Sequence, residues 1–97
     1  MKIHMITDLE GPALINRFTQ TRDVTPEEKP RWMRLLTGEV NACIDGIRDA
    51  VPDAEVVVWD GHGSGGIIEE LFHRDGKLIA RGPISAPSGL DESFDAL

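Results

Sequence analysis

Four side chains that could support chemistry lie in two short segments of the sequence. Asp8 and Glu10 follow one apolar run, and Asp60 and His62 follow another. Two carboxylates and an imidazole are ligands that suit zinc or another divalent transition metal. A histidine that stands alone in a turn usually only bonds the backbone, whereas one beside two carboxylates is a better candidate ligand. We therefore expect a metal site formed by Asp8, Glu10 and His62.

The two apolar runs, residues 3–6 and 56–59, are typical of buried strands. They are continuous rather than alternating, which favours a parallel sheet covered on both faces. A long helical pattern lies between them, so the unit is strand–helix–strand with a right-handed crossover. This topology brings the carboxyl ends of both strands to one edge of the sheet, where open α/β sheets place their ligands.

The intervening helix has the clearest periodicity in the sequence. We expect a turn at residues 26–29 and a helix that begins near Pro30, since proline is tolerated only at a helix start. Apolar residues recur at the spacing of one buried helix face: Trp32, Leu35, Leu36, Val40, Cys43, Ile44, Ile47 and Val51. Cys43 belongs to this stripe, so we expect a buried core cysteine rather than a reactive thiol.

Beyond the second strand the pattern predicts smaller elements. A short helix is expected at 67–72, a turn at 75–76 and a third strand at 78–80. Pro83, Ser85 and the residues up to Gly89 indicate an irregular connection, and 95–97 look like the approach to another strand. We expect an α/β fold of three-layer type with a mostly parallel sheet. Residues 1–97 would form a single domain, the N-terminal part of a larger one, because three strands and one helix leave an open edge.

The remaining histidines are weaker candidates for a functional role. His4 lies within the first strand, so we expect it to be packed, and His73 is expected in a solvent-exposed turn.

Composition excludes several classes of function. The chain has 97 residues and a net charge of −7, which argues against binding nucleic acid. One cysteine excludes a disulfide framework. No segment has the apolar length of a membrane span, and the N-terminus lacks the apolar region of a signal peptide. We expect a cytoplasmic protein with no nucleic-acid or membrane partner.

The glycine-rich loop 61–66 has competing interpretations. It matches the G-x-G-x-x-G pattern of dinucleotide-binding loops, but Asp60 directly before it would repel a pyrophosphate. Ser64 lacks the glycine two residues earlier that a nucleophile elbow requires, and the Gly-Lys-Ser/Thr ending of a phosphate-binding Walker loop is missing. Dinucleotide binding and a purely structural turn remain open as alternatives to a metal site.

Four segments carry a resemblance to a known family. Residues 1–11 contain a D-x-E-G loop, 57–63 contain a D-x-H segment, and 37–44 and 89–97 accompany them in the same order. Their order and spacing resemble those of the bacterial D-aminopeptidases of the dipeptide-permease operon, along the whole chain. The resemblance implies a dinuclear zinc peptidase that hydrolyses short peptides with an N-terminal D-residue. It also implies a homo-oligomer of stacked rings.

The resemblance also implies roles for individual residues. Asp8 would bridge both zinc ions, and Glu10 and His62 would complete the ligands of the first. Asp60 receives no ligand role from the family, and by its position we expect it to orient His62 or a loop amide. The family's remaining zinc ligands and its catalytic histidine would lie beyond Leu97. The catalytic residues are therefore unknown, and we expect the isolated chain to be inactive or nearly so.

Two hypotheses follow for the function. In the first, the chain is part of a zinc-dependent aminopeptidase. In the second, it is a non-catalytic truncated domain that acts as an oligomerisation or binding module.

Overall fold

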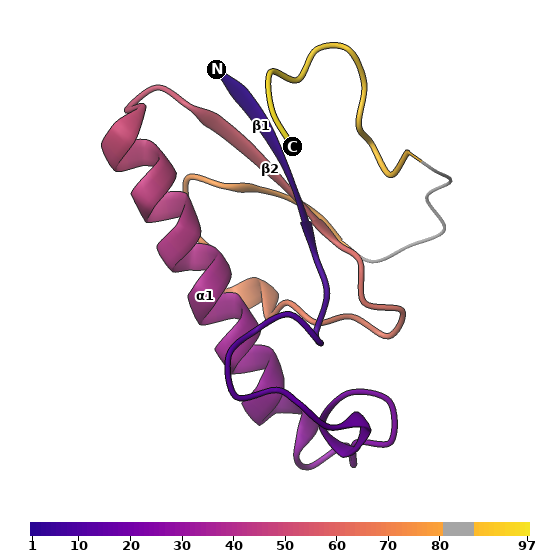
Figure 1. The fold of residues 1–97 in the computed structure, drawn as a ribbon. Coiled ribbons are helices and arrows are strands. Elements are labelled where there is room, and N and C mark those ends of the chain that lie inside the picture. Colours follow the sequence, from indigo (N-terminus) through magenta and orange to yellow (C-terminus); the bar gives the residue numbers. More distant parts are fainter. Residues whose placement is uncertain (81–86) are drawn as a thin grey trace.

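The computed structural model describes residues 1–80 and 87–97 and shows an α/β unit (Figure 1). One long helix, α1 (Lys29–Ala50), connects the first two strands of a parallel sheet. The sheet has the strand order β1-β2-β3 and consists of β1 (Lys2–Thr7), β2 (Glu55–Asp60) and β3 (Lys77–Ile79). The strand–helix–strand unit and the parallel sheet that the sequence predicts are confirmed.

β1 and β2 are paired along their whole lengths. Lys2 lies opposite Glu55 at one end, and Thr7 lies opposite Asp60 at the other. The pairing continues one step further, because the Gly61 amide donates a hydrogen bond of 2.9 Å to the Thr7 carbonyl. The chain segments that follow the two strands therefore leave the sheet side by side, as the sequence predicts.

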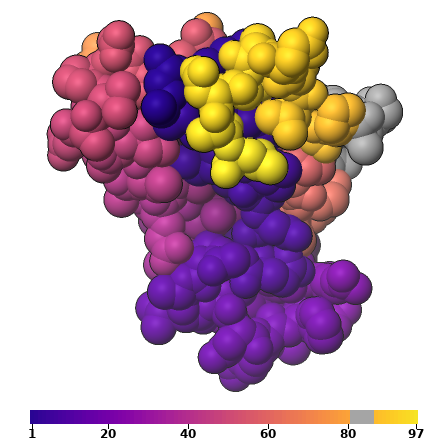
Figure 2. Space-filling view, turned by 45° about the horizontal axis from the view of Figure 1, so that its top comes forward, coloured from indigo at the N-terminus to yellow at the C-terminus, as the bar shows by residue number. Residues whose placement is uncertain are grey.

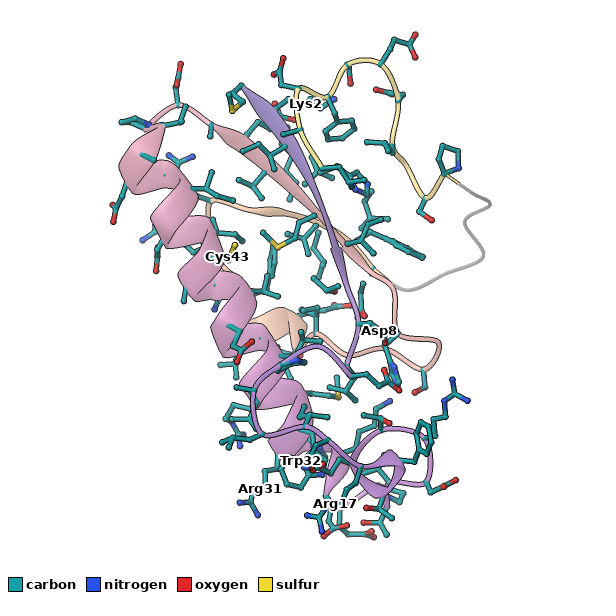
Figure 3. The ribbon with its side chains drawn as sticks, viewed as in Figure 1. Lys2, Asp8, Arg17, Arg31, Trp32 and Cys43 are labelled. Atoms are coloured by element: carbon teal, nitrogen blue, oxygen red, sulfur yellow. The ribbon has the colours of Figure 1, made fainter. Side chains whose placement is uncertain are left out.

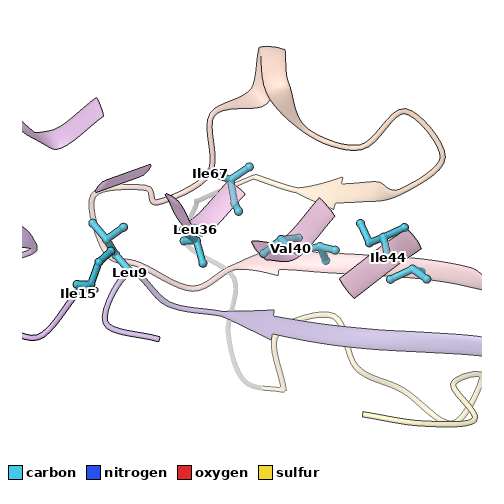
Figure 4. Close-up of a cluster of buried hydrophobic side chains, with 8 residues drawn as sticks. Leu9, Ile15, Leu36, Val40, Ile44 and Ile67 are labelled. Carbon is cyan, nitrogen blue, oxygen red and sulfur yellow. The ribbon is translucent and has the colours of Figure 1, made fainter. Parts of the chain in front are cut away.

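α1 begins and packs as its apolar pattern predicts. A turn precedes it, in which the Glu28 amide donates to the Thr25 hydroxyl, and Pro30 stands in the first helical turn. Leu36, Val40 and Ile44 are buried and lie in the core cluster with the inward side chains of β2 (Figure 4). Other members of the stripe, Trp32, Leu35 and Ile47, are partly buried against this core.

The expectation of a buried Cys43 is wrong, because Cys43 is exposed. Cys43 lies next to β1, the outermost strand of the described sheet. With Ile6, Ile47 and Leu97 it lines a cavity of about 360 Å³. Helical periodicity identifies an apolar face but does not say how much of that face the sheet covers. In the described part of the chain, only one bridge, from Ala96 to Ile3, adds to this side of β1.

The C-terminal segment covers β1 on the face opposite α1 (Figure 2). His4 is 1% exposed, and its Nε2 donates to the Ser88 carbonyl at 3.0 Å. The ring of Phe94 meets His4 edge to face at 5.0 Å. The amides of Asp95 and His4 bond carbonyls across the two segments, so residues 95–96 begin to pair with β1. His4 is thus packed, as expected.

Of the smaller elements predicted beyond β2, the strand is confirmed and the helix is shorter than expected. β3 (Lys77–Ile79) begins one residue before the expected range 78–80. The expected helix at 67–72 is a single turn of 3-10 helix, η2 (Glu69–Leu71), and a turn at 74–75 precedes β3. The expected positions Pro83 and Ser85 lie outside the described residues. None of the helices in the described ranges combines the length and apolarity needed to cross a bilayer.

Candidate metal centre

Asp8 and Glu10 are placed by a tight turn at the end of β1 (Figure 3). The Gly11 amide donates to the Asp8 carbonyl at 3.1 Å and closes the turn. Leu9, between the two acids, is 0% exposed and belongs to the core cluster. Burial of this one leucine fixes the turn, and both acidic side chains remain accessible on its outer side.

His62 is placed by a loop that Asp60 holds closed. The buried Asp60 carboxylate accepts hydrogen bonds from the amides of Gly66, at 3.0 and 2.9 Å, and Ile67, at 3.0 Å. A carboxylate that accepts several amide bonds is a strong local anchor. Asp60 therefore fixes the far end of the loop to the end of β2, and His62 lies between these two points. The same contacts occupy amides that a dinucleotide's phosphates would need.

The glycines of the loop have a packing explanation. A Cβ at Gly61 would lie 2.6 Å from the Thr7 carbonyl oxygen, and one at Gly66 would lie 2.8 Å from Leu36 Cδ2. Gly65 has a φ of 88°, in the region that side chains disfavour. Two of the four loop glycines thus allow the two strand ends and α1 to approach closely, and a third, Gly65, permits the backbone conformation of the loop.

The three predicted ligands lie together. His62 Nδ1 is 3.0 Å from Asp8 Oδ1 and 3.5 Å from Glu10 Oε2. One potential ligand atom from each residue lies within 4.8 Å of the other two. Ligand atoms bound to one tetrahedral zinc ion at about 2.0–2.2 Å would be about 3.4 Å apart. The side chains are therefore already spaced close to the geometry of a shared cation.

The electrostatics of the cluster favour a cation. Burial raises the pKa of Asp8, but hydrogen bonds with Glu10, His62 and a backbone amide outweigh it. The net effect holds the pKa of Asp8 below its ordinary value of 3.8. Asp8 is consequently ionised at neutral pH and available as a ligand.

A cavity of about 370 Å³ opens directly onto the cluster. Besides the three predicted ligands, its wall includes Thr21 and Arg22. Neither residue is predictable from the sequence, because the segment that contains them has no apolar period. Another wall residue, Ser64, accepts a 2.7 Å hydrogen bond from Lys29 Nζ. Among the described residues no histidine forms a hydrogen bond with the Ser64 hydroxyl, which does not support a serine nucleophile.

The segment before α1 is ordered by one buried side chain, Gln20. Its Oε1 accepts hydrogen bonds from the amides of Asn16 and Arg17 at 2.9 and 3.0 Å. Its Nε2 donates to the Leu14 carbonyl at 2.9 Å. A 3-10 helix, η1 (Phe18–Gln20), follows these contacts and leads to Thr21. The segment is therefore a defined wall of the cavity.

The other histidines do not join the cluster. His4 is packed under the C-terminal segment, as described above. His73 stands before a turn, as predicted, but its side chain is only 13% exposed because Nε2 pairs with Asp45 at 2.7 Å. The predicted solvent turn is present, with Arg74 and Asp75 exposed. His73 itself is partly buried, since α1 supplies an acidic partner that turn chemistry does not reveal. Among the described residues, one group of three potential metal ligands is found.

Comparison with known proteins gives one match. The model of the Peptidase M55 family, described as D-aminopeptidase, matches residues 1–97. No curated protein and no solved structure matches the chain.

Proposed function

The chain belongs to the Peptidase M55 family of D-aminopeptidases, and on that premise we propose that Asp8, Glu10 and His62 hold a catalytic zinc ion. The observation that carries this proposal is the meeting of the three side chains at one edge of the sheet. Their atoms come from two loops more than fifty residues apart in the sequence. The proposed activity is hydrolysis of short peptides that begin with a D-residue.

The donor set supports zinc as the metal. One imidazole nitrogen and two carboxylates are ordinary zinc ligands, and three protein ligands leave the fourth position of a tetrahedral site for water or substrate. The spacing of 3.0 and 3.5 Å between donor atoms is close to that of ligands sharing one ion. His62 is 8% exposed, so its ring is held in place by packing before any metal binds.

Each residue has a definable task in such a site. When bound, zinc supplies a Lewis acid that acidifies water and polarises the scissile carbonyl. The Asp8 and Glu10 carboxylates supply the negative charge that retains the cation, and His62 supplies the nitrogen ligand. Asp60 keeps the loop of His62 closed through the Gly66 and Ile67 amides. Displacing His62 by about 1 Å would lower the catalytic rate substantially. Asp60 prevents such a displacement because it holds the loop that carries His62.

Zinc binding by the purified chain tests the proposal. Isothermal titration calorimetry is expected to show zinc bound by the wild type and affinity reduced at least about a hundredfold in His62→Ala, because even outer partners of metal ligands are worth about 10–100-fold. His73→Ala is the matched control and should bind zinc like the wild type. Equal zinc affinity in wild type and His62→Ala would contradict the proposal.

The substrate part of the proposal needs its own comparison. Calorimetry should compare a dipeptide that has an N-terminal D-residue with its L-enantiomer on the zinc-loaded protein, because binding does not require turnover. We propose that the D-peptide binds more tightly. Tighter binding of the L-peptide would contradict the proposed chirality.

A second candidate function, association with further copies of the chain, is favoured by the outer side of β1. Ile6 and Leu97 are 51% and 72% exposed and line the apolar cavity beside Cys43. Exposed apolar groups next to a strand edge that is only partly paired are typical of interaction surfaces. We propose that the chain forms a homo-oligomer through this edge. Sedimentation velocity should show association in the wild type and a monomer in Ile6→Lys, and a monomeric wild type would contradict it.

A further inference from the structure

A second cavity lies beside the proposed metal centre and has a different chemical character. It has a volume of about 410 Å³. Its lining residues are Glu10, Ile15, Asn16, Arg17, Phe18 and Thr21. Both cavities lie at the small end of the roughly 300–1,000 Å³ typical of ligand sites. Each is therefore suited to a small group rather than to a folded partner.

The two cavities are adjacent. Glu10 and Thr21 line both of them, so a proposed zinc ligand forms part of the wall of each. Phe18 of one cavity and Arg22 of the other are in contact, with the Arg22 guanidinium 5.3 Å from the centre of the Phe18 ring. A ligand held at Asp8, Glu10 and His62 would therefore have the second cavity next to it.

Two apolar side chains, those of Ile15 and Phe18, line the second cavity. Ile15 is buried in the core cluster, and Phe18, which lines the same cavity, is 63% exposed. An exposed aromatic ring in a cavity can lose water contact when an apolar group binds. The backbone of Phe18 is fixed, because its carbonyl accepts hydrogen bonds from the amides of three successive residues, 21–23. The ring therefore projects from a preorganised backbone.

We propose that this second cavity binds the apolar side chain of the N-terminal residue of the peptide substrate. The inference rests on the proposed function, because it takes the carbonyl of that residue to be at the zinc centre. The Cβ atom of the first residue is two bonds from the scissile carbonyl carbon, whereas that of the second residue is three bonds away. The side chain of the first residue therefore lies closest to the metal centre. It is the one best placed to enter the neighbouring cavity, which shares Glu10 with that centre.

The test uses amino-acid hydroxamates, which bind zinc without requiring turnover. Calorimetry should compare the hydroxamates of D-leucine, D-alanine and D-aspartate on the zinc-loaded full chain. D-leucine hydroxamate should bind about tenfold more tightly than the D-alanine compound, since small apolar differences in such pockets are worth about tenfold or more. The D-aspartate compound should bind no better than the D-alanine one.

Two variants locate the effect. Phe18→Ala should reduce the preference for D-leucine over D-alanine to about threefold or less. Leu14→Ala is the matched control, because Leu14 is an exposed apolar residue of the same segment that does not line the cavity, and it should keep the wild-type preference. Circular dichroism and unfolding midpoints establish that both variants fold.

The possible failures are distinguishable. Absence of zinc binding would overturn the proposed function and this inference together. Zinc binding with equal affinity for the D-leucine and D-alanine hydroxamates, or an undiminished preference in Phe18→Ala, would overturn the inference alone. Preferred binding of the D-aspartate compound would also overturn it, because Arg17 would then define the cavity instead of Phe18.

Discussion

Asp8 and Asp60 carry the same functional group, but their surroundings differ. Asp8 lies on an accessible turn and faces His62 across 3.0 Å. Asp60 is 5% exposed, and its carboxylate is occupied by the amides of the glycine-rich loop. The first is free to take a cation, whereas the second maintains the structure around the cation. The same substitution, aspartate to asparagine, should therefore have different effects at the two positions.

We predict that Asp8→Asn weakens zinc binding with little change in stability, because the Asp8 side chain is exposed. Asp60→Asn should lower the free energy of unfolding by about 1–3 kcal/mol, because an amide group replaces an acceptor of buried N–H groups. Urea unfolding of the metal-free variants and zinc calorimetry measure the two effects. Equal loss of stability in both variants would contradict this division of tasks.

At the scale of elements, the site depends on how closely β1 and β2 end together. Gly61 allows this approach, since a Cβ there would lie 2.6 Å from the Thr7 carbonyl oxygen. Gly63, two residues later, has no atom within 4 Å of the corresponding position. The two glycines look alike in the sequence, but only the first is required by the contact between the strands.

Gly61→Ala should therefore cost about 1–3 kcal/mol of stability through overpacking and also weaken zinc binding. Gly63→Ala provides the matched control and should change neither property appreciably. Chemical denaturation and calorimetry on both variants check the prediction. Equal stability and equal zinc affinity in the two alanine variants would contradict the prediction. In that case His62 would not be positioned by the close approach of the strand ends.

The C-terminal segment gives a prediction for pH. The hydroxyl and amide of Ser93 both donate to Asp91 and hold the pKa of Asp91 below its ordinary value of 3.8. A lowered folded-state pKa adds stability that is present above pH 3.8 and is lost as the pH falls through the folded value. Ser93→Ala should thus raise the Asp91 titration midpoint seen by NMR, and its stability deficit should shrink below about pH 4. A midpoint unchanged by Ser93→Ala would contradict this.

At the scale of the whole molecule, the sequence predicts what depends on local pattern and on topology. The periodic stripe of α1 identified Leu36, Val40 and Ile44, and the order of strand, helix and strand brought Asp8 and His62 together. The exposure of Cys43 could not be predicted in the same way, because it depends on the width of the sheet rather than on the helix.

The second cavity was beyond prediction for a related reason. Its walls come from a segment without apolar period, whose shape depends on the hydrogen bonds of the buried Gln20. A glutamine in a polar loop gives no signal that it will be buried. The order of strands and helix in the sequence therefore predicts which residues are the metal ligands, but it does not predict the second cavity beside them.

The most direct test of the metal centre is a crystal of the zinc-loaded chain, with an anomalous difference map recorded at the zinc absorption edge. We expect a peak about 2.0–2.2 Å from His62 Nδ1 and from carboxylate oxygens of Asp8 and Glu10. A map with no peak at these side chains, or with its zinc bound only by His73 and Asp45, would contradict it.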